Sequence, residues 1–323
     1  MNSFVTVIGT VFMDVKGFAN QNYQATGRNL GNIQFVHGGV GRNVAENLAK
    51  LGTNTGFVST VDSSGMGLEV INHLQANSIE TSFVQATDNG MGMWLAILNE
   101  NGELAGSISQ MPQVNTMQEL IIKHAEEFIS KSSHVVLEID LTVEIARHVI
   151  AVAKKHNKPV YGIPGNLDVA GKYKDVLDGL DCFIFNNYEA DVLFGHEFTS
   201  LELEAKLDAV KTYVDQSVGL QSVVVTLGEQ GSVYYDRRTQ ELGHQPVFPV
   251  DLIDSSGAGD SFFSGTVMAL IRGVALKNAV ICGTKVAGWT ITVKESICPD
   301  LTEKAQADAE FQRILTKAEV TLP

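Results

Sequence analysis

Short β-branched runs alternate with amphipathic helical stretches over most of the chain, and this alternation limits the possible folds more than any other feature. The expected strands span residues 5–8, 56–61, 134–139, 159–163, 182–186 and 223–227, and the expected helices span 42–51, 68–75, 143–156 and 203–214. The run at 223–227 is nearly continuously apolar, as in a strand buried on both faces. The pattern predicts an α/β fold, a three-layer sandwich in which helices cover a mostly parallel central sheet.

Two segments interrupt this alternation. The first, at about 12–37, is polar and Asn-rich, and the second, at about 90–110, carries a turn sequence at 99–102 that predicts a hairpin. We expect both to form a small antiparallel β lid over a cleft at the carboxyl ends of the main strands. An exposed lid sheet also favours a homodimer formed through the lid. Because no repeat or linker divides the chain, we expect a single domain over residues 1–323.

The formal net charge of −14 argues against a protein that binds a nucleic-acid polymer, because such binding depends on Lys and Arg neutralising phosphates. No apolar run approaches the roughly 20 residues needed to cross a bilayer, so we expect no membrane partner. The N-terminus lacks the basic and long apolar regions of a signal peptide, and the three cysteines are too scattered for a disulfide framework. These features predict a cytoplasmic location.

The strongest chemical signal is the segment 254–261, Asp-Ser-Ser-Gly-Ala-Gly-Asp-Ser, which precedes an apolar helical stretch. Gly257, Ala258 and Gly259 let the backbone approach a ligand, and amides at a helix N-terminus bind an anion such as a transferring phosphoryl group. A carboxylate at an anion site, here Asp260, is reasonable if it takes the proton of an attacking hydroxyl as a general base. The alternative is a glycine-rich turn in which Asp260 only caps a core helix.

A second glycine-rich segment, Gly38-Gly39-Val40-Gly41, precedes the helix expected at 42–51. Paired glycines allow backbone contact with a polar ligand, and Asn43 offers both a donor and an acceptor. No Gly-Lys-Ser/Thr follows, so the segment is not a P-loop. Taken alone, it fits a structural helix start and a ligand site equally well.

Together the two segments, a GG-x-G-x-N helix near the start and a D-[ST]-x-G-A-G-D helix in the last third, resemble the ribokinase-like, or PfkB, family of sugar and nucleoside kinases. The resemblance covers essentially the whole chain and implies a ribokinase-like fold. It also implies transfer of the γ-phosphoryl group of ATP to a hydroxymethyl group, with Asp260 as catalytic base and the amides of Gly257, Ala258 and Gly259 as the anion site.

The resemblance further implies which residues bind the two substrates. Those for the sugar or nucleoside are Asp14, Gly38, Gly39, Asn43 and Glu138. Those for the nucleotide, in segments that match the N-x-x-E and T-x-G-x-x-G motifs of the family, are Asn186, Thr226, Gly228 and Gly231. Glu189 is implied to organise Mg²⁺ indirectly, and Asp254 and Ser256 fall where related kinases bind a monovalent cation such as K⁺.

Within the family, residues 31–49 are most similar to pseudouridine kinases, which implies that the 5′-type hydroxyl of pseudouridine is the acceptor. Ribose, fructose, a phosphosugar and other nucleosides stay open as alternatives, as does a catalytically silent regulator that binds nucleosides. Arg42 is the only cation evident near the substrate motif, and this favours an uncharged substrate.

Overall fold

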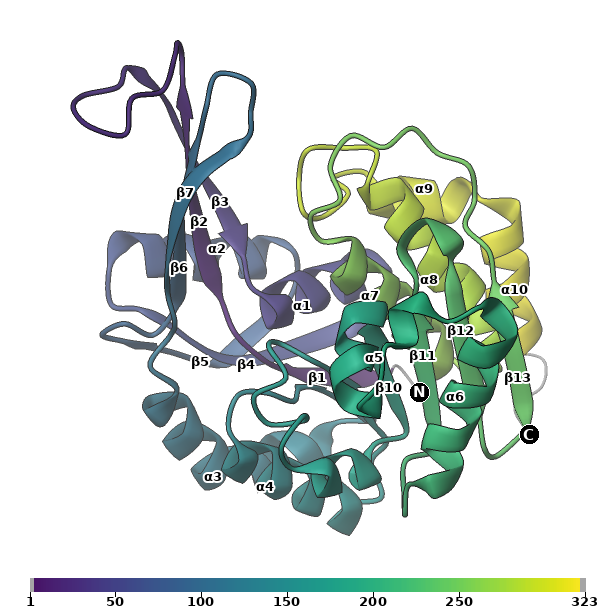
Figure 1. Cartoon of the computed structure of the whole chain (residues 1–323). Coiled ribbons are helices and arrows are strands. Elements are labelled where there is room, and N and C mark those ends of the chain that lie inside the picture. The colour runs from purple at the N-terminus through teal and green to yellow at the C-terminus, as the bar shows by residue number, and fades with distance from the viewer. Residues whose placement is uncertain (1–2, 320–323) are drawn as a thin grey trace.

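The β-branched runs of the chain lie side by side in one sheet, whose apolar faces both need cover from helices. In the computed structural model, which describes residues 3–319, nine strands form this sheet in the order β13-β12-β11-β10-β9-β8-β1-β4-β5 (Figure 1). The seven strands β11, β10, β9, β8, β1, β4 and β5 are parallel to one another. Strands β12 and β13 extend the sheet beyond β11 in antiparallel pairing. Their bounds are β1 (Phe4–Ile8), β4 (Asn54–Asp62), β5 (Glu80–Thr87), β8 (His134–Glu138), β9 (Val160–Ile163), β10 (Cys182–Asn186), β11 (Ser222–Thr226), β12 (Ser232–Asp236) and β13 (Glu241–Gln245).

Helices cover both faces of this sheet, each around its own apolar core. One face carries α1 (Val40–Lys50), α2 (Gly65–Ala76), α7 (Ala258–Ile271), α8 (Leu276–Thr290), α9 (Leu301–Ala307) and α10 (Ala309–Glu319). The other carries α3 (Val114–Lys131), α4 (Val143–Lys155), α5 (Asn187–Phe194) and α6 (Leu203–Gln216). The predicted three-layer α/β sandwich is therefore confirmed. Within residues 3–319, no helix has the length and apolar character that a membrane crossing requires.

The two segments that interrupt the alternation form a second, small sheet, which projects at the upper left of Figure 1. Its strands are β2 (Phe12–Ala19), β3 (Gly31–Gly38), β6 (Gly92–Leu98) and β7 (Leu104–Gln110), in the order β3-β2-β6-β7. The pairs β2–β3 and β6–β7 are antiparallel, and the two pairs join through parallel pairing of β2 with β6. The expected β lid is confirmed, and we call this sheet the lid.

The two faces of the lid differ in character, because side chains alternate along each strand. We call the face that carries Asp14 the inner face and the opposite face the outer face. On the outer face, Ile33, Phe35, Leu95 and Ile108 are exposed although they are apolar.

Candidate active site

Polar residues gather where the parallel strands end. Thr10 follows β1, Glu138 is the last residue of β8, Asn186 the last of β10 and Thr226 the last of β11. The carboxyl ends of parallel strands meet at one edge of a sheet, and this edge is where α/β proteins bind ligands. The four polar residues therefore lie along one edge of the main sheet.

Helix α7 begins at a turn that only glycine can form. Gly257 has φ 74°, in the left-handed region, and a Cβ added there would lie 1.9 Å from the carbonyl oxygen of Ser296. The backbone of Ser296 thus lies directly against Gly257, and the helix starts directly after this glycine, as the sequence predicts.

The first turn of α7 presents free amide groups. The amide of Ser261 donates to the carbonyl of Gly257 at 2.9 Å, whereas among the described residues the amides of Gly259 and Asp260 have no backbone acceptor. Such amides, together with the helix dipole, bind anions. The loop therefore has the geometry of an anion site.

The carboxylate of Asp260 lies beside this anion site and is held by Asn43. The Nδ2 of Asn43 donates to Oδ2 of Asp260 at 2.6 Å. Burial raises the pKa of Asp260 to about 6, although the Asn43 hydrogen bond and the charge of Arg42 act in the opposite direction. A carboxylate with such a pKa is ionised near neutral pH and is still basic enough to accept a proton.

Asp14 and the paired glycines lie next to each other at the base of the lid. A Cβ added to Gly38 would lie 3.0 Å from Oδ2 of Asp14, and Gly39, with φ 97°, leaves no room for a Cβ beside the carbonyl oxygen of Thr10. Burial raises the pKa of Asp14, against the charges of Lys16 and Arg42. The structure thus brings together the predicted residues Asp14, Gly38 and Gly39.

Glu138 is also at this edge, but its carboxylate is already engaged. It accepts hydrogen bonds from the amide of Thr10 at 2.7 Å and from the Thr10 hydroxyl at 3.0 Å, and its side chain is nearly fully buried. Burial raises the pKa of Glu138 to about 7, and the charge of Asp260 acts in the same direction. These contacts make Glu138 a support for the loop after β1 rather than an open contact for a substrate.

Asn186 and Glu189 cap the start of α5 reciprocally. The amide of Glu189 donates to Oδ1 of Asn186 at 2.9 Å, and the amide of Asn186 donates to Oε2 of Glu189 at 2.7 Å. Burial raises the pKa of Glu189 to about 7, and the charges of Asp140 and Asp260 add to this effect. The N-x-x-E motif therefore caps the start of α5. The other carboxylate oxygen of Glu189 is not used in this cap and remains near Asp260.

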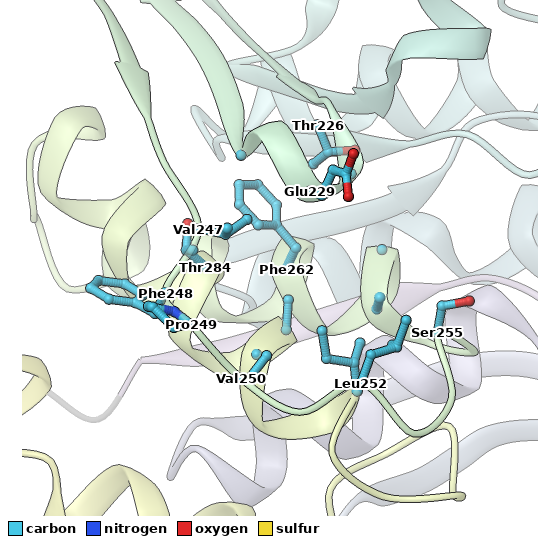
Figure 2. A pocket seen from close by; sticks show the side chains of 17 residues that line it. Thr226, Glu229, Val247, Phe248, Pro249, Val250, Leu252, Ser255, Phe262 and Thr284 are labelled. Atoms are coloured by element: carbon cyan, nitrogen blue, oxygen red, sulfur yellow. The ribbon is translucent and has the colours of Figure 1, made fainter.

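A cavity of about 480 Å³ opens beside the glycine loop (Figure 2). The predicted nucleotide residues Thr226, Gly228 and Gly231 line it, and so do Ala258 and Gly259 of the anion site. The remaining wall has two polar residues, Glu229 and Ser255, and is otherwise largely apolar. Its other residues come from the loop before α7 and from α7, α8 and the residue after α8: Val247, Phe248, Pro249, Val250, Leu252, Phe262, Thr284, Ala287, Gly288 and Ile291. A largely apolar cavity that borders an anion site is suited to a nucleotide. Asn186 does not line this cavity.

Asp254 and Ser256 lie on the loop between this cavity and α7. The amide of Ser256 donates to Oδ1 of Asp254 at 2.8 Å and closes a local turn. Among the described residues, no group of three or more His, Cys, Asp or Glu side chains could hold a metal ion.

Arg42 has a different role from the one that its position in the sequence suggests. Its guanidinium is buried, donates to Oε2 of Glu46 at 2.8 Å, and also donates to the backbone carbonyls of His37 and Gly38. His73 of α2 contacts the same oxygen of Glu46 at 2.9 Å. Arg42 is thus committed to holding the end of β3 against α1 and is not free for a substrate phosphate.

Sequence reasoning missed several residues that shape the site. Asp140 accepts hydrogen bonds from the amides of Gly165, Val169 and Ala170 and so fixes the loop after β9. The apolar wall of the cavity lies on a loop without periodicity and gives no local signal. Thr10 could have been found, because it directly follows the first strand at the edge where ligands bind.

Comparison with known proteins identifies relatives over nearly the full length. The model of the pfkB family carbohydrate kinases matches residues 2–303. The guanosine-inosine kinase of Exiguobacterium acetylicum is 34% identical over 305 residues, which are 94% of this chain and 99% of that protein. The pseudouridine kinase of Escherichia coli is 26% identical over 301 residues, 93% of this chain and 94% of that protein.

Solved structures show the same fold. A ribokinase from Giardia lamblia matches with a TM-score of 0.80 at 19% identity, over 98% of this chain and 99% of the other. A ribokinase from Arabidopsis thaliana, complexed with ribose and ATP, matches with a TM-score of 0.78 at 21% identity, over 95% and 98% of the two chains. The likeness extends across both the central sheet and the lid.

Proposed function

Because the chain belongs to the pfkB family of carbohydrate kinases, we propose that it transfers the γ-phosphoryl group of ATP to the 5′-type hydroxyl of a nucleoside, with Asp260 as the general base. One observation carries the proposal: the Asp260 carboxylate lies beside Asn43 at the start of a helix whose first amides are free. A catalytically silent regulator is not supported, since the chain is a kinase by family.

The acceptor's sugar lies between Asp14, the backbone of Gly39 and the side chain of Asn43. This placement brings the primary hydroxyl to Asp260. Asp260 takes the hydroxyl proton while the oxygen attacks the γ-phosphorus, and the bond from the γ-phosphorus to the bridging oxygen breaks to release ADP. Asn43 holds the carboxylate in line, and such positioning supplies much of the rate.

The nucleotide occupies the cavity beside Thr226 and Gly228, with its phosphates directed to the first turn of α7. The free amides of Gly259 and Asp260 stabilise the negative charge that develops on the transferred group, whereas the amide of Ala258 donates to the carbonyl of Ser255 at 3.2 Å. Asp254 and Ser256, just before these amides, would hold a monovalent cation such as K⁺, whose charge would help to order the loop.

The residues present fit an Mg²⁺ ion that is bound mainly through phosphates and water. Mg²⁺ is commonly held by only one or two carboxylates, and Glu189 offers one beside Asp260. When bound, the ion neutralises phosphate charge. The raised pKa values of Glu138 and Glu189 reflect burial in a site that is rich in carboxylates, which favours a cation.

Among nucleosides, we rank guanosine and inosine first, because the guanosine-inosine kinase is the relative with 34% identity. Pseudouridine, which the segment 31–49 suggests, is the second candidate, and the pseudouridine kinase at 26% identity supports it less strongly. Arg42 is committed to Glu46, so it does not supply a cation for the phosphate of a phosphosugar.

The test is a coupled assay of ADP release with guanosine, inosine, pseudouridine, uridine, ribose, fructose and fructose phosphate. We expect the highest kcat/KM with a purine nucleoside, and the product should carry the phosphate on the 5′ oxygen. Turnover of ribose or fructose alone, with no nucleoside accepted, would overturn the proposal.

The outer face of the lid supports a homodimer. Ile33, Phe35 and Ile108 are 68%, 62% and 69% exposed, and paired strands place them on one face. Exposed apolar patches of this kind mark interfaces. Light scattering should give a mass of two chains for the wild type and of one chain for Phe35→Glu; a monomeric wild type contradicts this part.

A further inference from the structure

The inner face of the lid carries two rows of side chains over the substrate site. Strand register pairs Asp14 with Val36 on one side and with Trp94 on the other, so these three share a row. Residues that are paired in register point to the same face of a sheet. Trp94 therefore lies beside Asp14, on the side of the lid where the acceptor's sugar is expected.

The indole of Trp94 lies outside the two apolar cores of the protein. Its side chain is partly buried, yet it belongs to neither apolar core. In the part of the chain that the structure describes, its ring stacks on no other aromatic ring and forms no hydrogen bond. A large aromatic side chain outside both cores, next to a carboxylate that suits sugar hydroxyls, is placed to contact a ligand.

The next row of side chains toward the tip of the lid contains two polar residues. Lys16 pairs with Gln34 and with Ala96 in the strand register, so all three lie on the inner face. Within residues 3–319 the Lys16 ammonium forms no hydrogen bond or ion pair, although its charge is felt at both Asp14 and Asp254. It is therefore a donor on the inner face without a partner in the described residues, two residues beyond Asp14.

We propose that this inner face is a nucleobase site in which Trp94 stacks on the base and Lys16 donates to its edge, which makes a 6-oxopurine the preferred base. The inference rests on the proposed nucleoside kinase function and specifies its substrate class. A base attached to a ribose at Asp14 reaches the neighbouring Trp94 and the next row at Lys16.

The chemistry of the two side chains defines the preference. Aromatic stacking binds any base by its π-face and favours large ring systems. A lysine ammonium has donors only, and O6 and N7 of guanine or hypoxanthine both accept hydrogen bonds. Adenine presents an amino group at position 6, which cannot accept, so Lys16 disfavours adenosine.

The stacking role is tested by kcat/KM of purified Trp94→Ala, Trp94→Phe and Ile122→Ala with inosine and with ribose. We expect Trp94→Ala to lower kcat/KM for inosine by about 10- to 100-fold, the range typical of lost base stacking, with little change for ribose. Trp94→Phe should recover most of the loss. Ile122→Ala, an exposed apolar position on α3 outside the lid, is the control and should behave like the wild type.

The edge contact is tested with Lys16→Gln, whose amide both donates and accepts. The ratio of kcat/KM for inosine to that for adenosine should fall about tenfold. If Lys16→Gln instead lowers kcat equally for inosine, adenosine and ribose, the lysine serves phosphoryl transfer and the edge contact is refuted.

The outcomes separate the two proposals. If the wild type phosphorylates no nucleoside, the proposed function fails before the base site is tested. If it phosphorylates inosine and Trp94→Ala keeps both that activity and its preference over ribose, the base site alone is wrong.

Discussion

The side-chain amide of Asn43 and the carboxylate of Asp260 lie 2.6 Å apart, although 217 positions separate them in the sequence. The contact joins α1, which follows the lid, to α7, which begins at the anion site. A second hydrogen bond, one turn further along α1, links the same two helices: Asn47 Nδ2 donates to the Ser261 hydroxyl at 3.3 Å. The residues that hold the acceptor and the residue that deprotonates it are therefore parts of one packed helix pair.

Asp260→Asn should retain nucleotide binding and lose most turnover. The amide keeps the size of the side chain but cannot take the proton, so kcat should fall by the roughly 10²–10⁴-fold typical of general-base catalysis. ADP affinity, measured by calorimetry, should change little. Asp251→Asn, a like change at an exposed position of the preceding loop, is the control. A near-normal kcat in Asp260→Asn would refute the role of this residue.

Activity should rise with pH as Asp260 ionises. Its pKa of about 6 predicts that kcat/KM increases about tenfold per unit below pH 6 and levels off above it. The Asn43 hydrogen bond lowers this pKa, so Asn43→Ala should move the acid limb to higher pH. Profiles of kcat/KM against pH for the wild type and Asn43→Ala measure this shift. If the acid limb of the profile is unchanged in Asn43→Ala, its assignment to Asp260 is contradicted.

Two glycines of the anion site should respond differently to alanine. At Gly257, with φ 74°, strain of about 1–3 kcal/mol adds to a collision with the Ser296 carbonyl, so Gly257→Ala should lower Tm. At Gly259 an added Cβ meets nothing within 4 Å, but it enters the nucleotide cavity. Gly259→Ala should therefore keep or raise Tm, as expected for Ala in a helix, and raise KM for ATP about tenfold or more. Equal KM values for wild type and Gly259→Ala would place the phosphates elsewhere.

The fold was largely predictable because its signals are local. Apolar runs and helical periodicity located six central strands and four helices, and the turn at 99–102 located the β6–β7 hairpin. The sequence does not reveal strand β2. Its polar residues Asp14 and Lys16 alternate with Val15 because one face of the strand meets the substrate site, and that depends on the fold. The helix α3 and edge strand β5 were likewise not predicted.

The site was predictable only where a motif is contiguous. The glycine loop and the start of α1 could be read from neighbouring residues. The bond between Asn43 and Asp260, the burial of Glu138 under Thr10 and the pairing of Trp94 with Asp14 depend on strand order and register, which no local pattern encodes.

Arg42 illustrates the same point and yields a final prediction. The sequence shows a cation beside a substrate motif, but the structure buries it against Glu46, with side chains only 3% and 6% exposed. Arg42→Met leaves the Glu46 charge buried with only His73 and, at 3.9 Å, Lys50 as partners, so the free energy of unfolding should fall by about 3–5 kcal/mol. Urea denaturation measures this, and the double variant Arg42→Met/Glu46→Leu should recover much of the loss because the buried carboxylate is then also removed. The exposed pair Arg147–Asp175 is the control, and Arg147→Met should hardly move the midpoint. If Arg42→Met is as stable as Arg147→Met, the buried pair does not hold the end of β3 against α1.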